Sequence, residues 1–148
     1  MRNSKNIKSG TVLMYNCSGP EFSKLRQIFA MLRMRMHPIT PDRYNVTLGE
    51  LVNGEGQGVP EAEAPAAFDE RILVFCNVGR ALLNQTLEVI RLSKLPEIQL
   101  KAVLTETNQS WNSIELHNEL MQERAAIAEQ LKAKEAEKAA QAAEKPQE

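Results

Sequence analysis

A run of five apolar residues, Ile72-Leu73-Val74-Phe75-Cys76, decides which fold class the sequence predicts. The run has the length of a strand, and no polar residue marks a solvent-exposed side. Residues 12–15 (VLMY) have the same character. Strands that are apolar at every position are typical of an open, mainly parallel sheet with helices on both faces. The alternative is a ferredoxin-like α+β sheet with helices on one face, in which apolar and polar residues would alternate.

Each apolar run is followed by a turn that contains glycine and then by a helical pattern. Residues 21–34 carry apolar side chains at spacings of three and four, which places them on one helix face, and residues 83–90 repeat this pattern. A weaker strand follows at residues 35–39, which Pro38 assigns to a sheet edge, and a further strand is predicted at residues 100–104. We therefore predict a small four-stranded sheet in the order 2-1-3-4. The likeness of the halves raises the hypothesis of an old duplication, although alternating elements also converge on such patterns.

The chain of 148 residues has room for one domain of ordinary size. We place this α/β domain at residues 11–124 and expect residues 1–10 to be a disordered N-terminus. The segment 53–67 is rich in Gly, Pro, Glu and Ala, has little to bury, and predicts a flexible surface loop. Residues 125–148 are rich in Ala, Lys and Glu, which favour helix, so we predict a charged helical tail that frays and ends at Pro146.

A long C-terminal helix is predicted from Asn112 onward. Its apolar stripe consists of Leu116, Leu120, Ile127 and Leu131, and Glu123 and Arg124 interrupt the heptad pattern. Sustained coiled coils need three or four heptads. We therefore expect the first turns to pack on the domain's own sheet, with a monomer or a weak homodimer through this helix.

The composition argues against several classes of partner. The net charge is -1 and aromatic residues make up 5% of the chain, which favours neither phosphate neutralisation nor base stacking, so no nucleic acid is expected. No apolar run approaches the ~18 residues of a membrane span, and no signal peptide is recognised. We therefore predict a cytoplasmic protein without a membrane partner. Cys17 and Cys76 fit that compartment as free thiols.

A candidate ligand site follows from the parallel arrangement. In an open parallel sheet, ligands bind beyond the carboxyl ends of the strands where the strand order reverses, and helix N-termini there suit an anion. Seven residues are expected to gather at that edge: Cys17, Ser18, Asn77, Gly79, Arg80, Thr105 and Asn108. The structural interpretation is that Ser18, Asn77 and Asn108 only cap helices and turns. Neither turn is a P-loop or a dinucleotide-binding fingerprint.

No catalytic residue, metal site or cofactor is predicted. A thiolate at Cys17 would need a base, and the two histidines, His37 and His117, are not predicted near it. With only two histidines and no Cys-x-x-Cys spacing, the sequence lacks the ligand pattern of a structural zinc site. We therefore expect a non-catalytic protein-interaction or regulatory module with an unidentified protein partner. The alternative is a small-ligand or anion-binding protein, an enzyme included, that uses the edge near Cys17 and Asn77.

The stretch from Leu100 to Trp111 (LKAVLTETNQSW), followed by Glu115-Leu116 and Glu119-Leu120, resembles a bacterial domain-of-unknown-function family, number 3783. Tyr44 with residues 47–49 resembles the middle segment of that family. The resemblance would cover roughly Thr11 to Arg124 and implies a folded unit, but no activity or ligand.

The second half is also distantly similar to a response-regulator receiver domain in the rhythm of its elements. Receivers need carboxylates after the first and third strands. Here those places hold Asn16-Cys17 and Cys76-Asn77, so phosphoryl transfer to this chain is not expected.

Overall fold

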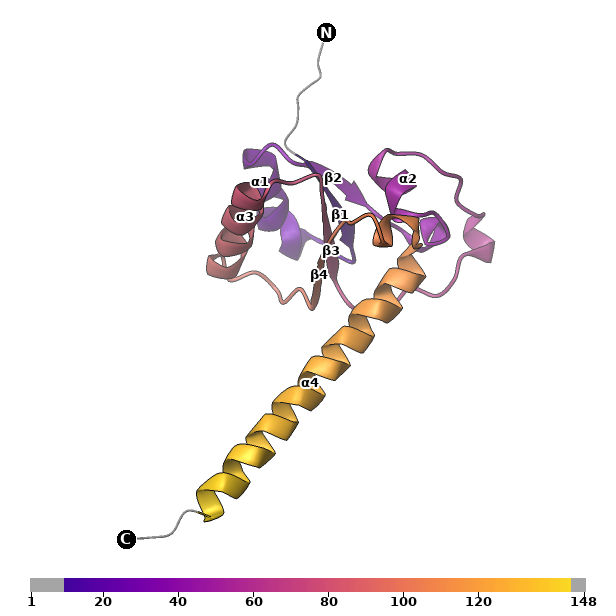
Figure 1. Ribbon diagram of the computed structural model, residues 1–148. Helices are drawn as coiled ribbons and strands as arrows, with labels where there is room; N and C mark the ends of the chain where they lie inside the picture. Colours follow the sequence, from indigo (N-terminus) through magenta and orange to yellow (C-terminus); the bar gives the residue numbers. More distant parts are fainter. Residues whose placement is uncertain (1–9, 145–148) are drawn as a thin grey trace. The chain divides into compact units, whose positions relative to one another are not determined.

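The computed structural model describes residues 10–144 (Figure 1). The chain forms two compact units, one up to Ile114 and the other from Glu115 onward. The predicted disorder of residues 1–10 falls, apart from Gly10, outside the described residues, and so does the predicted end of the tail at Pro146.

The first unit contains one sheet in the order β2-β1-β3-β4. Its strands are β1 (Thr11–Tyr15), β2 (Arg35–Pro38), β3 (Ile72–Cys76) and β4 (Leu100–Val103). β2 runs parallel to β1 and β4 runs parallel to β3, whereas β1 and β3 are antiparallel. The predicted strand order is confirmed. The prediction of a mainly parallel sheet is wrong, because the sheet of this α/β unit is mixed.

The wrong strand direction has a physical reason in the two central strands. Every residue of β1 and β3 is buried. Their apolar runs therefore show that both faces of these strands are covered, but they do not indicate whether the strands are parallel or antiparallel. The connection from β2 to β3 leaves the sheet beside Met14, which pairs with Pro38, and returns beside Tyr15, which pairs with Ile72. The connection therefore begins and ends at the same end of the sheet. It does not cross to the opposite end, so β3 runs antiparallel to β1.

Helices α1 (Ser23–Met31) and α3 (Arg80–Leu92) lie together on one face of the sheet (Figure 1). Leu25 and Phe29 of α1 are buried there against strand residues such as Phe75, whose ring meets that of Phe29 edge-on with centroids 6.3 Å apart. Burying a side chain such as Leu25 completely stabilises a fold by about 1.5–3 kcal/mol. This apolar layer anchors both helices.

The opposite face is covered by the short helix α2 (Leu48–Val52) and by irregular segments. A capping box between Thr47 and Glu50 starts α2, with each residue's side chain bonded to the other's backbone N–H. On this face the rings of Tyr44 and Phe68 stack with centroids 4.7 Å apart. The hydroxyl of Tyr15 bonds to that of Ser113 at 2.7 Å. Both faces are thus covered, so the ferredoxin-like alternative does not describe the sheet.

The two β-α-β halves share their backbone geometry. Asn16 and Asn77, each directly after the first strand of a half, have φ of 62° and 60°. Arg33 and Lys94, each just after the helix, have φ of 60° and 54°. The same number of positions separates the two members of each pair, which is consistent with the duplication hypothesis.

The segment 53–67, predicted as a flexible loop, contains a short 3-10 turn, Glu61–Glu63. Hydrogen bonds tie it to the preceding turn: Arg43 donates to the carbonyl of Glu55 at 2.8 Å, and the backbone N–H of Val59 donates to Asp42 at 2.8 Å. Its flexibility stays a prediction.

Helix α4 (Ser113–Glu144) has 32 residues, and the predicted long C-terminal helix is thereby confirmed. Its side chains are all exposed from Gln122 to Ala142. Across residues 10–144, no helix combines the length and the apolar character that crossing a membrane requires.

Candidate functional site

The seven candidate residues lie at two opposite ends of the sheet. Cys17 and Ser18 follow β1, at the end where Ile72 begins β3. Asn77, Gly79 and Arg80 follow β3 at the other end, where Thr11 pairs with Cys76. Thr105 and Asn108 follow β4, which is parallel to β3, so they lie at that second end. The expected gathering of all seven is therefore wrong, and its cause is the antiparallel pairing of β1 with β3.

At the first end, Cys17 is held as a buried, protonated thiol. Its Sγ–H donates to the carbonyl of Tyr15 at 3.3 Å. Burial raises the pKa of Cys17 to about 11, although Arg71 and Arg26 lower it. Arg26 also donates to the carbonyls of Cys17 and Gly19, at 3.2 and 3.1 Å. At this end of the sheet, Arg26 therefore holds the turn by hydrogen bonds. The Cys17 thiol is a poor nucleophile near neutral pH.

Asn16, which directly precedes Cys17, holds the segment that leads into β3. Its side-chain amide donates to the carbonyls of Phe68 and Glu70, at 2.8 and 2.7 Å. Its positive φ is one that asparagine tolerates better than most residues. An asparagine directly after a strand was the available signal, and it marks a structural position.

At the second end, Asn77, Gly79 and Arg80 are exposed. Gly79 is the N-cap of α3 and makes no side-chain capping hydrogen bond. The neighbouring Cys76 is buried, which raises the pKa of its thiol to about 12. These exposed residues can meet solvent or a partner, but they form no enclosed site with Cys17.

Asn108 is buried and organises the turn after β4. Its Oδ1 accepts from the backbone N–H of Thr105 at 2.8 Å, and its Nδ2 donates to the carbonyl of Val103 at 3.0 Å. Its own backbone N–H donates to the hydroxyl of Thr105 at 3.0 Å. The side-chain oxygen and nitrogen therefore both serve the turn, as the structural interpretation of Asn108 expects.

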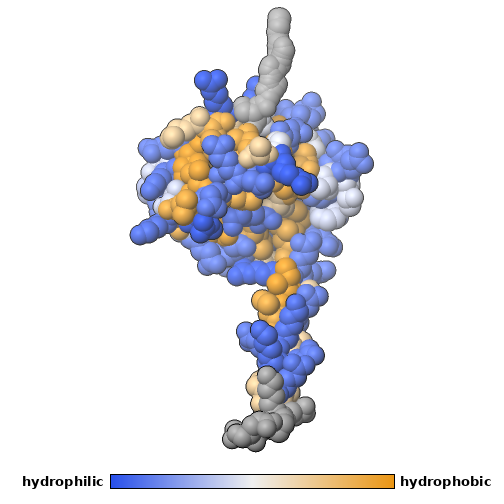
Figure 2. All heavy atoms as spheres, turned by 60° about the vertical axis from the view of Figure 1, so that its left-hand side comes forward, coloured by the Kyte–Doolittle hydropathy of each residue, from blue (hydrophilic) through white to orange (hydrophobic). Residues whose placement is uncertain are grey.

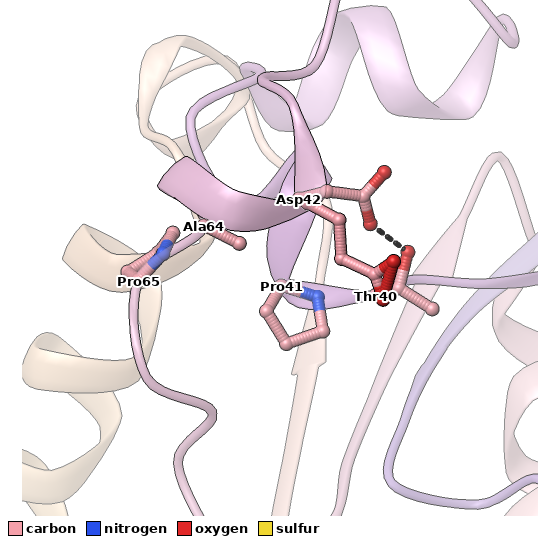
Figure 3. A pocket seen from close by; sticks show the side chains of 6 residues that line it. Thr40, Pro41, Asp42, Ala64 and Pro65 are labelled. Carbon is pink, nitrogen blue, oxygen red and sulfur yellow. Dashed lines mark hydrogen bonds between the residues drawn. The ribbon is translucent and has the colours of Figure 1, made fainter.

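A hollow that the sequence did not predict lies between the 3-10 turns Pro41–Arg43 and Glu61–Glu63. It has a volume of about 570 Å³ and is lined by Thr40, Pro41, Asp42, Glu61, Ala64 and Pro65. Figure 3 shows Ala64 and Pro65 on one side and Asp42, which accepts a hydrogen bond from Thr40, on the other. Its lining contains carboxylates but no cationic or thiol side chain. In the described part of the chain, no three His, Cys, Asp or Glu residues are grouped to hold a metal ion.

Exposed apolar side chains are the more informative surface feature. Met31 and Leu92, the last residues of α1 and α3, are exposed. Isolated apolar residues on the surface are common in folded proteins. Ile127 and Leu131 lie one turn apart on the same face of α4 and are 57% and 56% exposed. Figure 2 shows apolar side chains among hydrophilic ones along this helix.

Residues 71–127 match a family model described as "Domain of unknown function (DUF3783)". The match supports membership of that family for this segment of the chain. The DUF3783 segment contains β3, α3, β4 and the beginning of α4 as far as Ile127. It starts well after Thr11, where the resemblance was expected to begin, so Cys17 and Ser18 lie outside it, whereas Asn77 and Asn108 lie inside. No curated protein and no solved structure matches the chain.

Proposed function

We propose that this chain is a non-catalytic protein-interaction module that binds its partner through α4. The observation that carries the proposal is the pair Ile127 and Leu131, which are more than half exposed on one helix face. Leu120 lies one heptad before Ile127 and extends the same face. An amphipathic helix of this kind is a common recognition element, because its apolar face can lie in a groove or against another helix.

The local sequence supports a binding role for this apolar pair. Ala, Lys and Glu, which surround Ile127 and Leu131, are good helix formers, whereas isoleucine is a poorer one because its branched side chain loses rotamer freedom. Ile127 therefore adds nothing that helix formation needs. Ile127 is 57% exposed and so buries little apolar area within the chain. A partner that covered this side chain would gain the free energy of burying it.

The non-catalytic part of the proposal rests on the sheet. Burial keeps the thiols of Cys17 and Cys76 protonated, because it raises both pKa values. The amide of Asn108 is engaged in its own turn. The alternative of a ligand- or anion-binding protein needed Cys17 and Asn77 at one edge, and they lie at opposite ends of the sheet. We therefore favour the interaction module. Free thiols at Cys17 and Cys76 suit a reducing compartment, and the proposal places the module in the cytoplasm.

Site-specific photo-crosslinking in cells that express the full chain tests this proposal. A photoreactive residue at position 127 should give a discrete adduct with a protein. The same residue at position 129, about 200° around the helix, is the matched control and should give much less. Equal adducts from both positions, or none from position 127, would overturn the proposal.

A further inference from the structure

The geometry points to a second copy of this chain as the partner, paired through an antiparallel contact between two α4 helices. This inference rests on the proposed function, because it names the occupant of the Ile127–Leu131 face. It uses only the described residues of α4, where each residue advances about 100° around the helix axis.

The apolar pair is self-complementary in an antiparallel arrangement. If two α4 helices cross at the level of Glu129, Ile127 of each lies opposite Leu131 of the other. Glu129 itself is on the far side of the helix and does not meet its own copy. Leu120 then lies opposite Lys138 of the other copy, whose aliphatic stem can cover it while the ammonium group reaches water. One two-fold axis thus pairs all the large apolar residues of the exposed part.

The charges flanking the apolar pair match the same alignment. Glu123 and Lys134 lie on one flank of the face, and Arg124 and Glu135 lie on the other. In an antiparallel pair related by a two-fold axis, like flanks meet. Glu123 therefore lies beside the second copy's Lys134, and Arg124 lies beside its Glu135. The apolar pair and both charge pairs converge on one register, centred near Glu129.

A parallel pair lacks this complementarity. It would set Lys138 directly against its own copy in the centre of the contact. It would also gather Glu115, Glu119 and Glu123 of both helices at one end, where like charges repel. The three glutamates at one end of this face and Lys138 at the other therefore favour the antiparallel direction. Only four large apolar side chains at the centre become covered, so the dimer is weak.

Disulfide trapping tests the direction. One preparation of the full chain carries Ile127→Cys and a second carries Leu131→Cys, and the two are mixed and oxidised. The antiparallel contact predicts mostly mixed disulfides between positions 127 and 131. The buried native thiols, Cys17 and Cys76, stay out of the exchange in the folded chain. A predominance of disulfides between identical positions, or statistical mixing, would overturn the antiparallel arrangement.

Sedimentation of the full chain at low salt, over a wide range of concentrations, tests the register. Glu123→Lys or Lys134→Glu alone should weaken self-association about ten-fold, because two symmetry-related attractions become repulsions. The double variant Glu123→Lys/Lys134→Glu should restore it. Glu129→Lys, which changes the net charge as Glu123→Lys does but on the far face, should leave it unchanged.

A double variant no more associated than the single ones would contradict the register. A wild-type chain that stays monomeric at every concentration would overturn self-pairing. If position 127 then still crosslinks to a different protein, the proposed function stands and only the choice of partner is wrong. If position 127 gives no face-specific adduct, both fail.

Discussion

Replacing Asn108 by alanine removes the two side-chain hydrogen bonds that hold the turn after β4. The substitution leaves the backbone N–H of Thr105 and the carbonyl of Val103 without their partner. Each such bond contributes about 0.5–1.5 kcal/mol net, so Asn108→Ala should lower the free energy of unfolding by about 1–3 kcal/mol. Thr105→Ala, which removes only the bond from the Asn108 backbone N–H, should cost about half as much.

Urea denaturation of both variants measures these values, with the double variant completing a cycle. Thr105 and Asn108 belong to one network, so the cost of the double variant should be less than the sum of the single costs. An Asn108→Ala chain as stable as wild type would refute the structural role of this side chain. It would return Asn108 to the candidates for ligand contact.

Three further predictions concern the thiols, a strained residue and the tail. The free energy of unfolding should fall as the pH rises from about 9 to about 11, because folded Cys17 keeps a proton that the unfolded chain loses near its ordinary pKa of 9.0; Cys17→Ala should make this fall shallower in pH-dependent denaturation. Lys94→Gly should stabilise the fold by about 1 kcal/mol in urea denaturation, since φ at Lys94 is 54° and glycine relieves the strain, whereas Lys94→Ala should not. Deleting residues 125–148 should shift the free energy of unfolding of the dilute chain by less than about 0.5 kcal/mol, because every described side chain from 125 to 142 is exposed.

The strand order and the main elements could be predicted from the sequence because they depend on local patterns. The runs at 12–15 and 72–76 are apolar, and the helical spacing after each of them is clear. The direction of β3 could not be predicted in this way. It depends on where the segment 39–71 returns to the sheet, which is a tertiary property, and Tyr15 pairs with Ile72 only once the whole segment is folded.

The prediction that the candidate residues gather at one edge was wrong for the same reason. Cys17 and Asn77 follow equivalent strands of the two halves, so a parallel sheet would bring them together, whereas an antiparallel pair of central strands separates them. Asn108 was correctly expected to organise a turn, because Asn at that spacing from Thr105 is a local signal. The exposed apolar pair on α4 was visible as part of the helical stripe. Its exposure could not be predicted, because it depends on which residues the rest of the chain leaves uncovered.

The most direct test of binding through α4 is the size of the assembly that contains this chain, determined by gel filtration of a concentrated extract in which the chain is abundant. The full chain is compared with an Ile127→Ser/Leu131→Ser variant and with an Ala126→Ser/Glu129→Ser control, since all three keep the same helix length and differ only in the α4 face. If α4 binds through this face, wild type and control elute in a larger assembly and the Ile127/Leu131 variant elutes later. Identical elution of all three chains would contradict it.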